Sequence, residues 1–301
     1  MKESYEVIVV GGSFAGLSAA MQLARARREV LLIDAERPRN RFASHAHGFF
    51  GQDGVPPAQT IATATAQLLK YPTVTLLKAE AHRASREASG FRVELTDGFH
   101  VKAERLILAT GIRDKLPPLP GLEARWGVSV LHCPYCHGYE VGDQRLGVLA
   151  THPLSIHQAL LIPDWGPTTW FTQGIVEPNA EEAALLSARG VRIERVPVAE
   201  IMGEAPSIDG VRLVDGRVIR IDALFISART EMASDLAEQL GCAVDEGPLG
   251  PVIRVSDFKE TSVPGVFAAG DASTAMTSAT FASASGVAAG VGAHRSLIFT
   301  K

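Results

Sequence analysis

Two cysteines with the spacing of a redox turn lie near the middle of the chain, each beside a histidine. The segment reads His132-Cys133-Pro134-Tyr135-Cys136-His137. In a Cys-x-x-Cys turn the pKa of the first thiol falls, so it attacks disulfides as a thiolate at neutral pH, and the second cysteine resolves the mixed disulfide. A histidine titrates close to neutrality and can take up a thiol proton. The segment predicts a redox-active dithiol with Cys133, Cys136 and His137 as candidate catalytic residues; a merely solvated His137 is the alternative.

The same segment allows two other interpretations. Cys-x-x-Cys-His attaches c-type haem, but that requires export, and residues 1–6 have neither the basic nor the apolar region of a signal peptide. Two cysteines and two histidines are also zinc ligands, although structural zinc draws its ligands from two separated pairs. We therefore favour the dithiol and expect no metal. The third cysteine, Cys242, is expected to be a small buried residue.

The dithiol needs an electron carrier, and the N-terminus has the pattern of a nucleotide-binding unit. Residues 7–10 form an apolar strand that runs into Gly11-Gly12-Ser13-Phe14-Ala15-Gly16, followed by a helical segment and a second apolar strand at 30–33 that ends at Asp34. Glycines let the backbone approach a pyrophosphate, the helix N-terminus offers N–H groups, and the acid binds ribose hydroxyls. Ser13 replaces the middle glycine of the fingerprint, while Asp34 lies near its required spacing of about 20 residues.

Two further apolar strands end in glycine, and the plan then repeats. One ends at Ala109-Thr110-Gly111 and the other at Gly270-Asp271. After the proline-rich bridge at 116–121, a strand, a helix and a strand recur. The predicted fold class is α/β, with two Rossmann-like three-layer nucleotide-binding domains, the second inserted into the first. We expect residues 1–114 and 246–301 to form the first domain and residues 115–245 the second.

These motifs, in this order, resemble those of the flavin-dependent pyridine nucleotide–disulfide oxidoreductases of the low-molecular-weight thioredoxin reductase type. The resemblance covers nearly the whole chain and implies a homodimer, with an FAD-binding first domain. It also implies that Cys136 lies against the flavin and Cys133 faces the substrate, while His137 replaces the acidic residue usual after the second cysteine. The FAD contacts that it implies are Gly11, Gly12, Ser13, Phe14, Ala15, Gly16, Asp34, Ala109, Thr110, Gly111, Gly270 and Asp271.

The second domain departs from the family where NADPH would bind. Its phosphate-binding turn reads Ala150-Thr151-His152-Pro153-Leu154-Ser155, without glycine, and Pro153 lacks an N–H for a phosphate. The basic segment that grips the 2′-phosphate is also missing, because residues 173–177 read Gln-Gly-Ile-Val-Glu. We therefore expect the second domain to be NADPH-domain-like with a degenerate nicotinamide site, and FAD without NADPH as cofactor.

Without a nicotinamide, the simplest electron donor is a substrate dithiol. The flow then reverses: the dithiol becomes a disulfide through Cys133 and Cys136, and O2 reoxidises the flavin to give hydrogen peroxide. This resembles the dithiol oxidases of natural-product biosynthesis, of the gliotoxin, holomycin and romidepsin type. The alternatives are a thioredoxin-disulfide reductase fed by NADPH, ferredoxin or a second flavin, and a flavin redox sensor. The substrate is expected to be a small-molecule dithiol or a thioredoxin-like protein.

Composition excludes other partner classes. The 301 residues carry a net charge of −4, with 46% hydrophobic and 21% charged residues, as in ordinary globular chains. No basic field is available to bind nucleic acid or an anionic membrane, and no apolar run is long enough to cross a bilayer. With three cysteines and no signal peptide, we expect a cytoplasmic protein.

Overall fold

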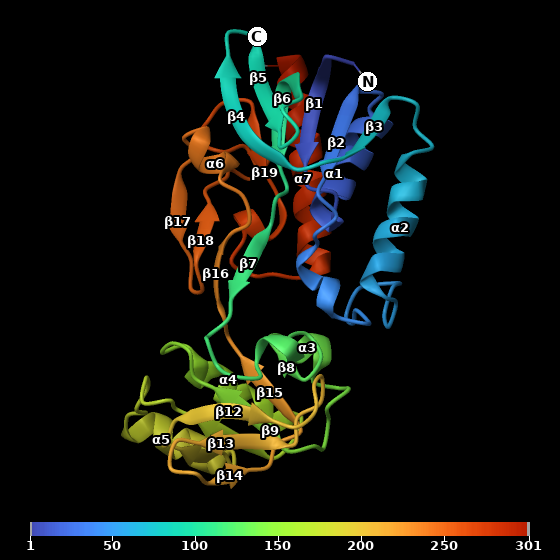
Figure 1. The fold of residues 1–301 in the computed structure, drawn as a ribbon. Coiled ribbons are helices and arrows are strands. Elements are labelled where there is room, and N and C mark those ends of the chain that lie inside the picture. The colour runs from blue at the N-terminus through green and yellow to red at the C-terminus, as the bar shows by residue number, and fades with distance from the viewer. Residues whose placement is uncertain (1, 300–301) are drawn as a thin grey trace. The chain divides into compact units, whose positions relative to one another are not determined.

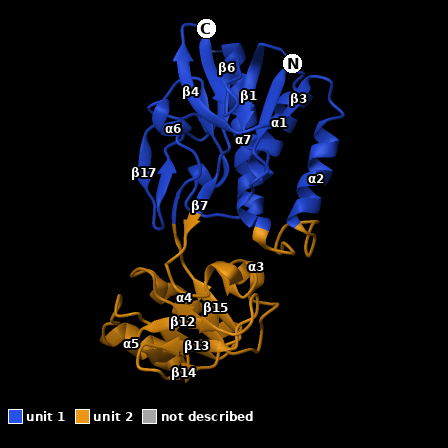
Figure 2. Ribbon diagram, viewed as in Figure 1, with its two compact units in different colours: residues 1–41, 57–113, 230–301 blue, residues 42–56, 114–229 orange. Residues whose placement is uncertain are grey.

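The computed structural model describes residues 2–299, and the chain divides into two compact units. Unit 1 comprises residues 1–41, 57–113 and 230–301, and unit 2 comprises residues 42–56 and 114–229 (Figure 2). The chain passes between them at 41/42 and 56/57, and again at β7 (Ile112–Lys115) and β16 (Arg229–Met232), which pair with each other.

Unit 1 is built on a sheet in the order β3-β2-β1-β6-β5-β4, with β19 also paired to β6 (Figure 1). Strands β1, β2, β3, β6 and β19 are parallel, whereas β4 and β5 are antiparallel to their neighbours. Their bounds are Ser4–Val10 (β1), Val30–Asp34 (β2), Val74–Lys78 (β3), Ala81–Glu87 (β4), Gly90–Leu95 (β5), His100–Leu108 (β6) and Val266–Ala268 (β19).

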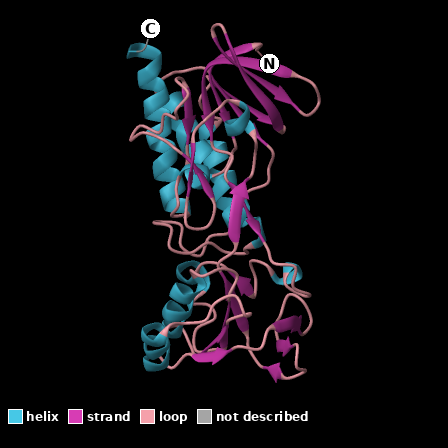
Figure 3. Ribbon diagram, turned by 90° about the vertical axis from the view of Figure 1, so that its left-hand side faces the viewer, coloured by secondary structure: helices cyan, strands magenta, loops and turns pink. Residues whose placement is uncertain are grey.

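The apolar residues of β1 face two different cores because side chains alternate across a strand. Val7 and Val9 pack with α1 (Phe14–Arg25) and α7 (Ala279–Phe299), while Ile8 and Val10 pack with β4, β5 and the segment around α6 (Leu236–Gln239). Figure 3 shows these helices and strands as separate layers. Helix α2 (Pro57–Leu68), the η1 (Arg39–Phe42) and η4 (Gly270–Ser273) turns, and the pair β17 (Val244–Glu246) and β18 (Pro251–Ile253) complete the unit.

Unit 2 repeats the plan with a parallel sheet in the order β11-β10-β9-β15-β8. The antiparallel strands β12, β13 and β14 pack against it through a shared core, and α4 and α5 pack on another. The bounds are Val130–Leu131 (β8), Leu146–Leu149 (β9), Thr168–Phe171 (β10), Arg192–Glu194 (β11), Val198–Met202 (β12), Gly210–Leu213 (β13), Val218–Ile219 (β14), Ala223–Ile226 (β15), Pro134–His137 (α3), Ser155–Leu161 (α4), Ala180–Ala188 (α5), Glu123–Arg125 (η2) and Ile162–Asp164 (η3). The predicted α/β class with two Rossmann-type domains is confirmed.

The two units divide at 41/42, 56/57, 113/114 and 229/230, whereas the expected limits were 114/115 and 245/246, with residues 42–56 in the first domain. Residues 230–245 belong to unit 1 because Leu236 and Cys242 are buried in its core. In the same segment the Gln239 side chain accepts a hydrogen bond from the Ala84 amide and donates one to the His82 carbonyl. Cys242 is a free, buried cysteine as predicted, and burial raises the pKa of its thiol. No helix within residues 2–299 is long and apolar enough to cross a membrane.

Candidate functional site

The turn between β1 and α1 is a tight glycine-dependent structure. Gly11 has a φ of +104°, which side-chain-bearing residues rarely adopt, and a Cβ there would lie 2.2 Å from the Ala109 carbonyl oxygen. A Cβ on Gly16 would lie 1.7 Å from the carbonyl oxygen of Gly11. Both positions therefore require glycine, and the turn packs directly on the residue that follows β6.

Asp34 sits at the carboxyl end of β2, against the same turn. Its Oδ1 accepts hydrogen bonds from the amides of Gly12 at 3.2 Å and Glu36 at 3.1 Å. A Cβ on Gly12 would lie 2.5 Å from the Asp34 carboxyl carbon, so glycine is needed here too. The Ser13 side chain makes no capping bond to α1, so it leaves the amide groups of the first turn to other partners.

The C-terminal motif joins this turn from another strand. Gly270 follows β19 and has a φ of +75°, and a Cβ there would lie 2.9 Å from that of Ala15. The Gly270 amide donates to the Ser285 hydroxyl at 3.1 Å. Next to it, the half-buried Asp271 carboxylate pairs with the Arg39 guanidinium at 3.1 Å. Unit 1 thus gathers its three glycine motifs at the carboxyl ends of β1, β6 and β19, with Thr110 and Gly111 directly after Ala109.

This gathering fits a dinucleotide. Gly11, Gly16 and Gly270 expose backbone without side chains at this edge of the sheet, and a pyrophosphate needs such backbone for close approach. The N-terminus of α1 lies next to them. A carboxylate on the second strand is the group that binds a ribose hydroxyl in such units. The residues that sequence analysis assigned to FAD are therefore brought to one edge of unit 1.

The redox turn lies in unit 2. Cys133 and Cys136 form a disulfide across α3, with their Cα atoms 5.3 Å apart. Cys133 is the extended N-cap residue and Pro134 opens the helix, where its missing N–H costs nothing. Both cysteines are partly exposed. Among residues 2–299, no group of three or more His, Cys, Asp and Glu side chains is arranged to hold a metal ion.

Aromatic side chains support and surround this turn. Tyr135, between the two cysteines, is 74% exposed and meets the Trp165 ring edge-on at 5.6 Å between centroids. A Cβ on Gly138 would lie 2.7 Å from the same indole ring, so glycine allows α3 to approach it. Tyr139 is 89% exposed. The disulfide is therefore held on a packed base and borders accessible apolar surface.

His137 ends α3 directly after the second cysteine. Burial lowers the pKa of its imidazole; the Glu140 carboxylate raises it and His47 lowers it, both by smaller amounts. His137 is therefore neutral at physiological pH and ready to accept a proton. His132 points elsewhere: its Nδ1 hydrogen-bonds the Ile226 carbonyl at 3.3 Å at the end of β15.

Sequence reasoning left the role of His47 open and did not connect it with Glu140 or Asp53. His47 Nε2 lies 3.3 Å from the Glu140 carboxylate, and His47 Nδ1 lies 3.6 Å from that of Asp53. His47 comes from the loop 42–56, which belongs to unit 2 although it interrupts the sequence of unit 1. No spacing rule relates two positions so far apart in the chain, so only the fold reveals their proximity.

The turn after β9, where NADPH would bind, is filled by its own side chains. His152 is only 4% exposed. Its Nε2–H donates to the Ser227 carbonyl at 2.8 Å, and its Nδ1 accepts from the Leu154 amide at 3.2 Å. The Thr151 hydroxyl donates to the same Ser227 carbonyl at 2.7 Å. The turn is thus closed by internal hydrogen bonds.

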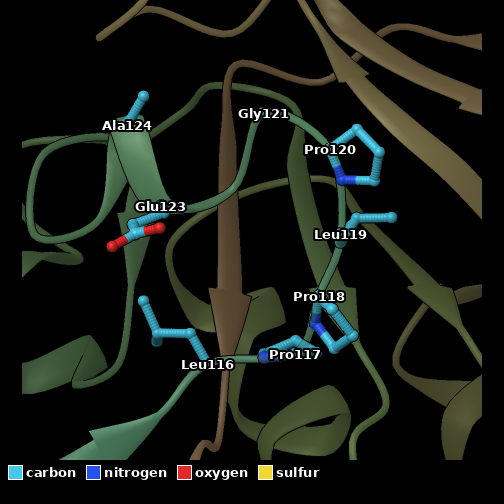
Figure 4. A pocket seen from close by; sticks show the side chains of 8 residues that line it. All are labelled: Leu116, Pro117, Pro118, Leu119, Pro120, Gly121, Glu123 and Ala124. Carbon is cyan, nitrogen blue, oxygen red and sulfur yellow. The ribbon is translucent and has the colours of Figure 1, made fainter.

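Unit 2 has two hollows whose linings contain no lysine or arginine, and the smaller one adjoins this turn. One, of about 350 Å³, is lined by residues 117–120, 149–151, Gln173, Ile175 and 198–199. The other, of about 800 Å³, follows the proline-rich bridge from Leu116 to Gly121 with Glu123 and Ala124 (Figure 4). Such walls offer no cationic partner to the 2′-phosphate of NADPH.

Comparison with known proteins gives a consistent picture. The model of the pyridine nucleotide-disulphide oxidoreductase family matches residues 5–148 and 176–286. Thioredoxin reductase tcpT of Claviceps purpurea is 34% identical over 281 residues, 88% of this chain and 86% of its own length. Thioredoxin reductase sirT of Leptosphaeria maculans is 32% identical over 308 residues, 96% and 93% of the two chains.

Solved structures agree. An oxidoreductase from Agrobacterium tumefaciens matches with a TM-score of 0.95 and 48% identity, over 99% of this chain and 100% of that one. The crystal structure of HlmI matches with a TM-score of 0.92 and 35% identity, over 99% and 94% of the two chains.

Proposed function

We propose, from the premise that this chain belongs to the pyridine nucleotide-disulphide oxidoreductase family and is an FAD-dependent oxidoreductase acting on sulfur groups, that it oxidises a dithiol to a disulfide. Cys133 and Cys136 exchange with the substrate, and O2 is the final electron acceptor. The substrate is a small-molecule dithiol or a thioredoxin-like protein. No reduced nicotinamide takes part.

The observation that carries this proposal is the closed turn after β9. A phosphate-binding turn presents free amides to the ligand, but here the Leu154 amide is already bonded to His152, and Pro153 has none. Opening the turn would expose a buried histidine and leave the Ser227 carbonyl without its two donors. An unsatisfied buried polar group costs about 1–3 kcal/mol. This cost supports the proposal that the enzyme works without NADPH.

The redox turn supplies the exchange chemistry. A substrate thiol gives its proton to the neutral His137, and the resulting thiolate attacks Cys133 Sγ. The Cys133–Cys136 bond breaks and Cys136 leaves as a thiolate. The second substrate thiol then attacks the substrate sulfur of the mixed disulfide, and its proton passes to Cys133, which leaves as a thiol. The substrate loses two protons and two electrons, and the cysteine pair gains the two electrons.

Unit 1 would hold the flavin at the glycine edge described above, with Asp34 placed for a ribose hydroxyl and the Gly11–Gly16 turn for the pyrophosphate. When bound, FAD accepts the electron pair of the reduced cysteines and passes it to O2, which becomes hydrogen peroxide. The roles of the individual glycine-motif residues are part of this proposal.

One anaerobic experiment tests the direction of electron flow. NADPH, then a small dithiol such as dithiothreitol, is added to the purified flavoprotein while the flavin absorbance is followed. We expect bleaching with the dithiol alone, and hydrogen peroxide after air is admitted. Bleaching by NADPH alone would overturn the proposal in favour of a thioredoxin-disulfide reductase, the activity named for the two fungal relatives. No turnover with either reagent would favour a redox sensor.

A further inference from the structure

The loop 42–56 brings a second histidine to the redox turn. Building on the proposed role of His137 as proton acceptor, we propose that His47 is a positioning residue of this turn. By pairing with Glu140, it offsets the carboxylate charge beside His137 and keeps His137 in its proton-accepting form. His47 would do so without touching the substrate or the reacting sulfurs.

The geometry of the loop fixes His47 in place. Residue 46 forms an antiparallel bridge with Val55, closed by two backbone hydrogen bonds of 3.1 and 2.9 Å. The Gly48 amide donates to the Asp53 carboxylate at 2.8 Å. The His47 imidazole is only 24% exposed. It lies between two carboxylates, with Nδ1 3.6 Å from Asp53 and Nε2 3.3 Å from Glu140.

The pair of His47 and Glu140 affects the pKa of His137 because both side chains act on that imidazole through their charges. Glu140 lies three residues after His137, in the turn that follows α3, and its carboxylate alone favours a proton on that imidazole, raising its pKa. A base that already holds a proton cannot take one from a thiol. A positive charge on His47 acts in the opposite sense and lowers the pKa of His137. His47 therefore limits the effect of Glu140. Asp53 faces His47 from its own loop, and the His45 ring is tilted toward the His47 ring at 6.5 Å between centroids.

Removing the two partners should shift the protonation of His137 in opposite directions. In His47→Gln the Glu140 carboxylate acts alone, so the pKa of His137 rises. The rate of dithiol-driven flavin reduction falls at low pH, where His137 is protonated, and this fall (the acid limb of the pH profile) moves to higher pH. In Glu140→Gln the raising influence is lost, and the limb moves to lower pH. The double variant should fall between these two. His45→Gln is the matched control, because His45 lies in the same loop, hydrogen-bonds the Ser44 hydroxyl and takes no part in the pair with Glu140; it should leave the profile unchanged.

Two readouts on the FAD-loaded full chain separate the possible failures. The first is the pH profile of anaerobic flavin reduction by dithiothreitol. The second is an NMR titration of the His137 imidazole in oxidised protein with labelled histidine, where His137→Gln identifies the signal. Opposite shifts in His47→Gln and Glu140→Gln by NMR support the proposal; equal shifts, or none, overturn it. If dithiothreitol fails to reduce even the wild-type flavin, the proposed function is wrong, and the NMR titration still decides the role of His47.

Discussion

Substituting Gly16 by alanine should empty the flavin site. The added Cβ would lie 1.7 Å from the Gly11 carbonyl oxygen, whereas carbon and oxygen in ordinary contact are about 3.4 Å apart. The obstacle is backbone, so the turn itself must move by more than an ångström. Overpacking of this kind costs roughly 1–3 kcal/mol and occasionally more. In a unit of this size, that corresponds to a fall of about 2–12 °C in Tm.

The assay is the ratio of flavin to protein absorbance after purification, together with thermal unfolding in the presence of added FAD. Gly98→Ala is the control in the same unit, because Gly98 has a φ of +85° but open space around it. That variant should lose roughly 1 kcal/mol through backbone strain and keep its flavin. Full FAD occupancy with an unchanged Tm in Gly16→Ala would refute the reasoning, because it would mean that the turn yields easily and does not shape the site.

Three further predictions concern unit 2. Cys136→Ser should abolish flavin reduction by dithiol, while Cys133→Ser should lose substrate exchange yet keep a thiolate able to give a long-wavelength charge-transfer band; identical spectra would leave the order of the pair unsupported. His137→Ala should slow dithiol-driven reduction and remove the acid limb of its pH profile, and an unchanged rate in stopped flow would return His137 to a solvated histidine. Burial lowers the pKa of His152 below its ordinary value of 6.5, so its contribution to stability is complete above that value and is lost as the pH falls through the lowered pKa. His152→Gln should therefore weaken the acid sensitivity of urea unfolding, and should not allow NADPH to bleach the flavin.

Local patterns allowed much of the fold to be predicted. The strand, helix and strand expected after the proline-rich bridge are found as β9, α4 and β10, because short apolar runs separated by turn residues define such elements locally. The domain boundary expected at 245/246 depended instead on which core received Leu236, and nothing in the local sequence decides that. The turn after β9 could be predicted only in part. Its missing glycines predicted a poor phosphate site, but only the fold shows that the His152 side chain is buried within the turn.

The pairing of His47 with Glu140 was beyond sequence reasoning for a different reason. A histidine in a loop is ordinarily solvated, and its partner lies in another segment whose approach depends on tertiary packing. Motifs identify groups that react; they do not identify the groups that tune them, since tuning acts through space rather than along the chain. Charged neighbours of a predicted base are therefore found only after folding.

Two features of unit 2 independently favour the same direction of electron flow. A reductase must deliver two protons to the disulfide that it opens, whereas an oxidase must remove two from the dithiol that it closes. Desolvation lowers the pKa of the His137 imidazole, which favours its neutral form with one ring nitrogen free to accept a proton, so His137 is suited to removal. The closed turn at His152 concerns the electrons rather than the protons, because its hydrogen bonds occupy groups that a nicotinamide dinucleotide would need. Random sequence change at an unused nicotinamide site would explain the closed turn at His152, but it gives no reason for a neutral base, His137, beside the cysteines. Conversion to dithiol oxidation explains both, and predicts that restoring glycines at 150 and 152 would not restore reductase activity while His137 remains.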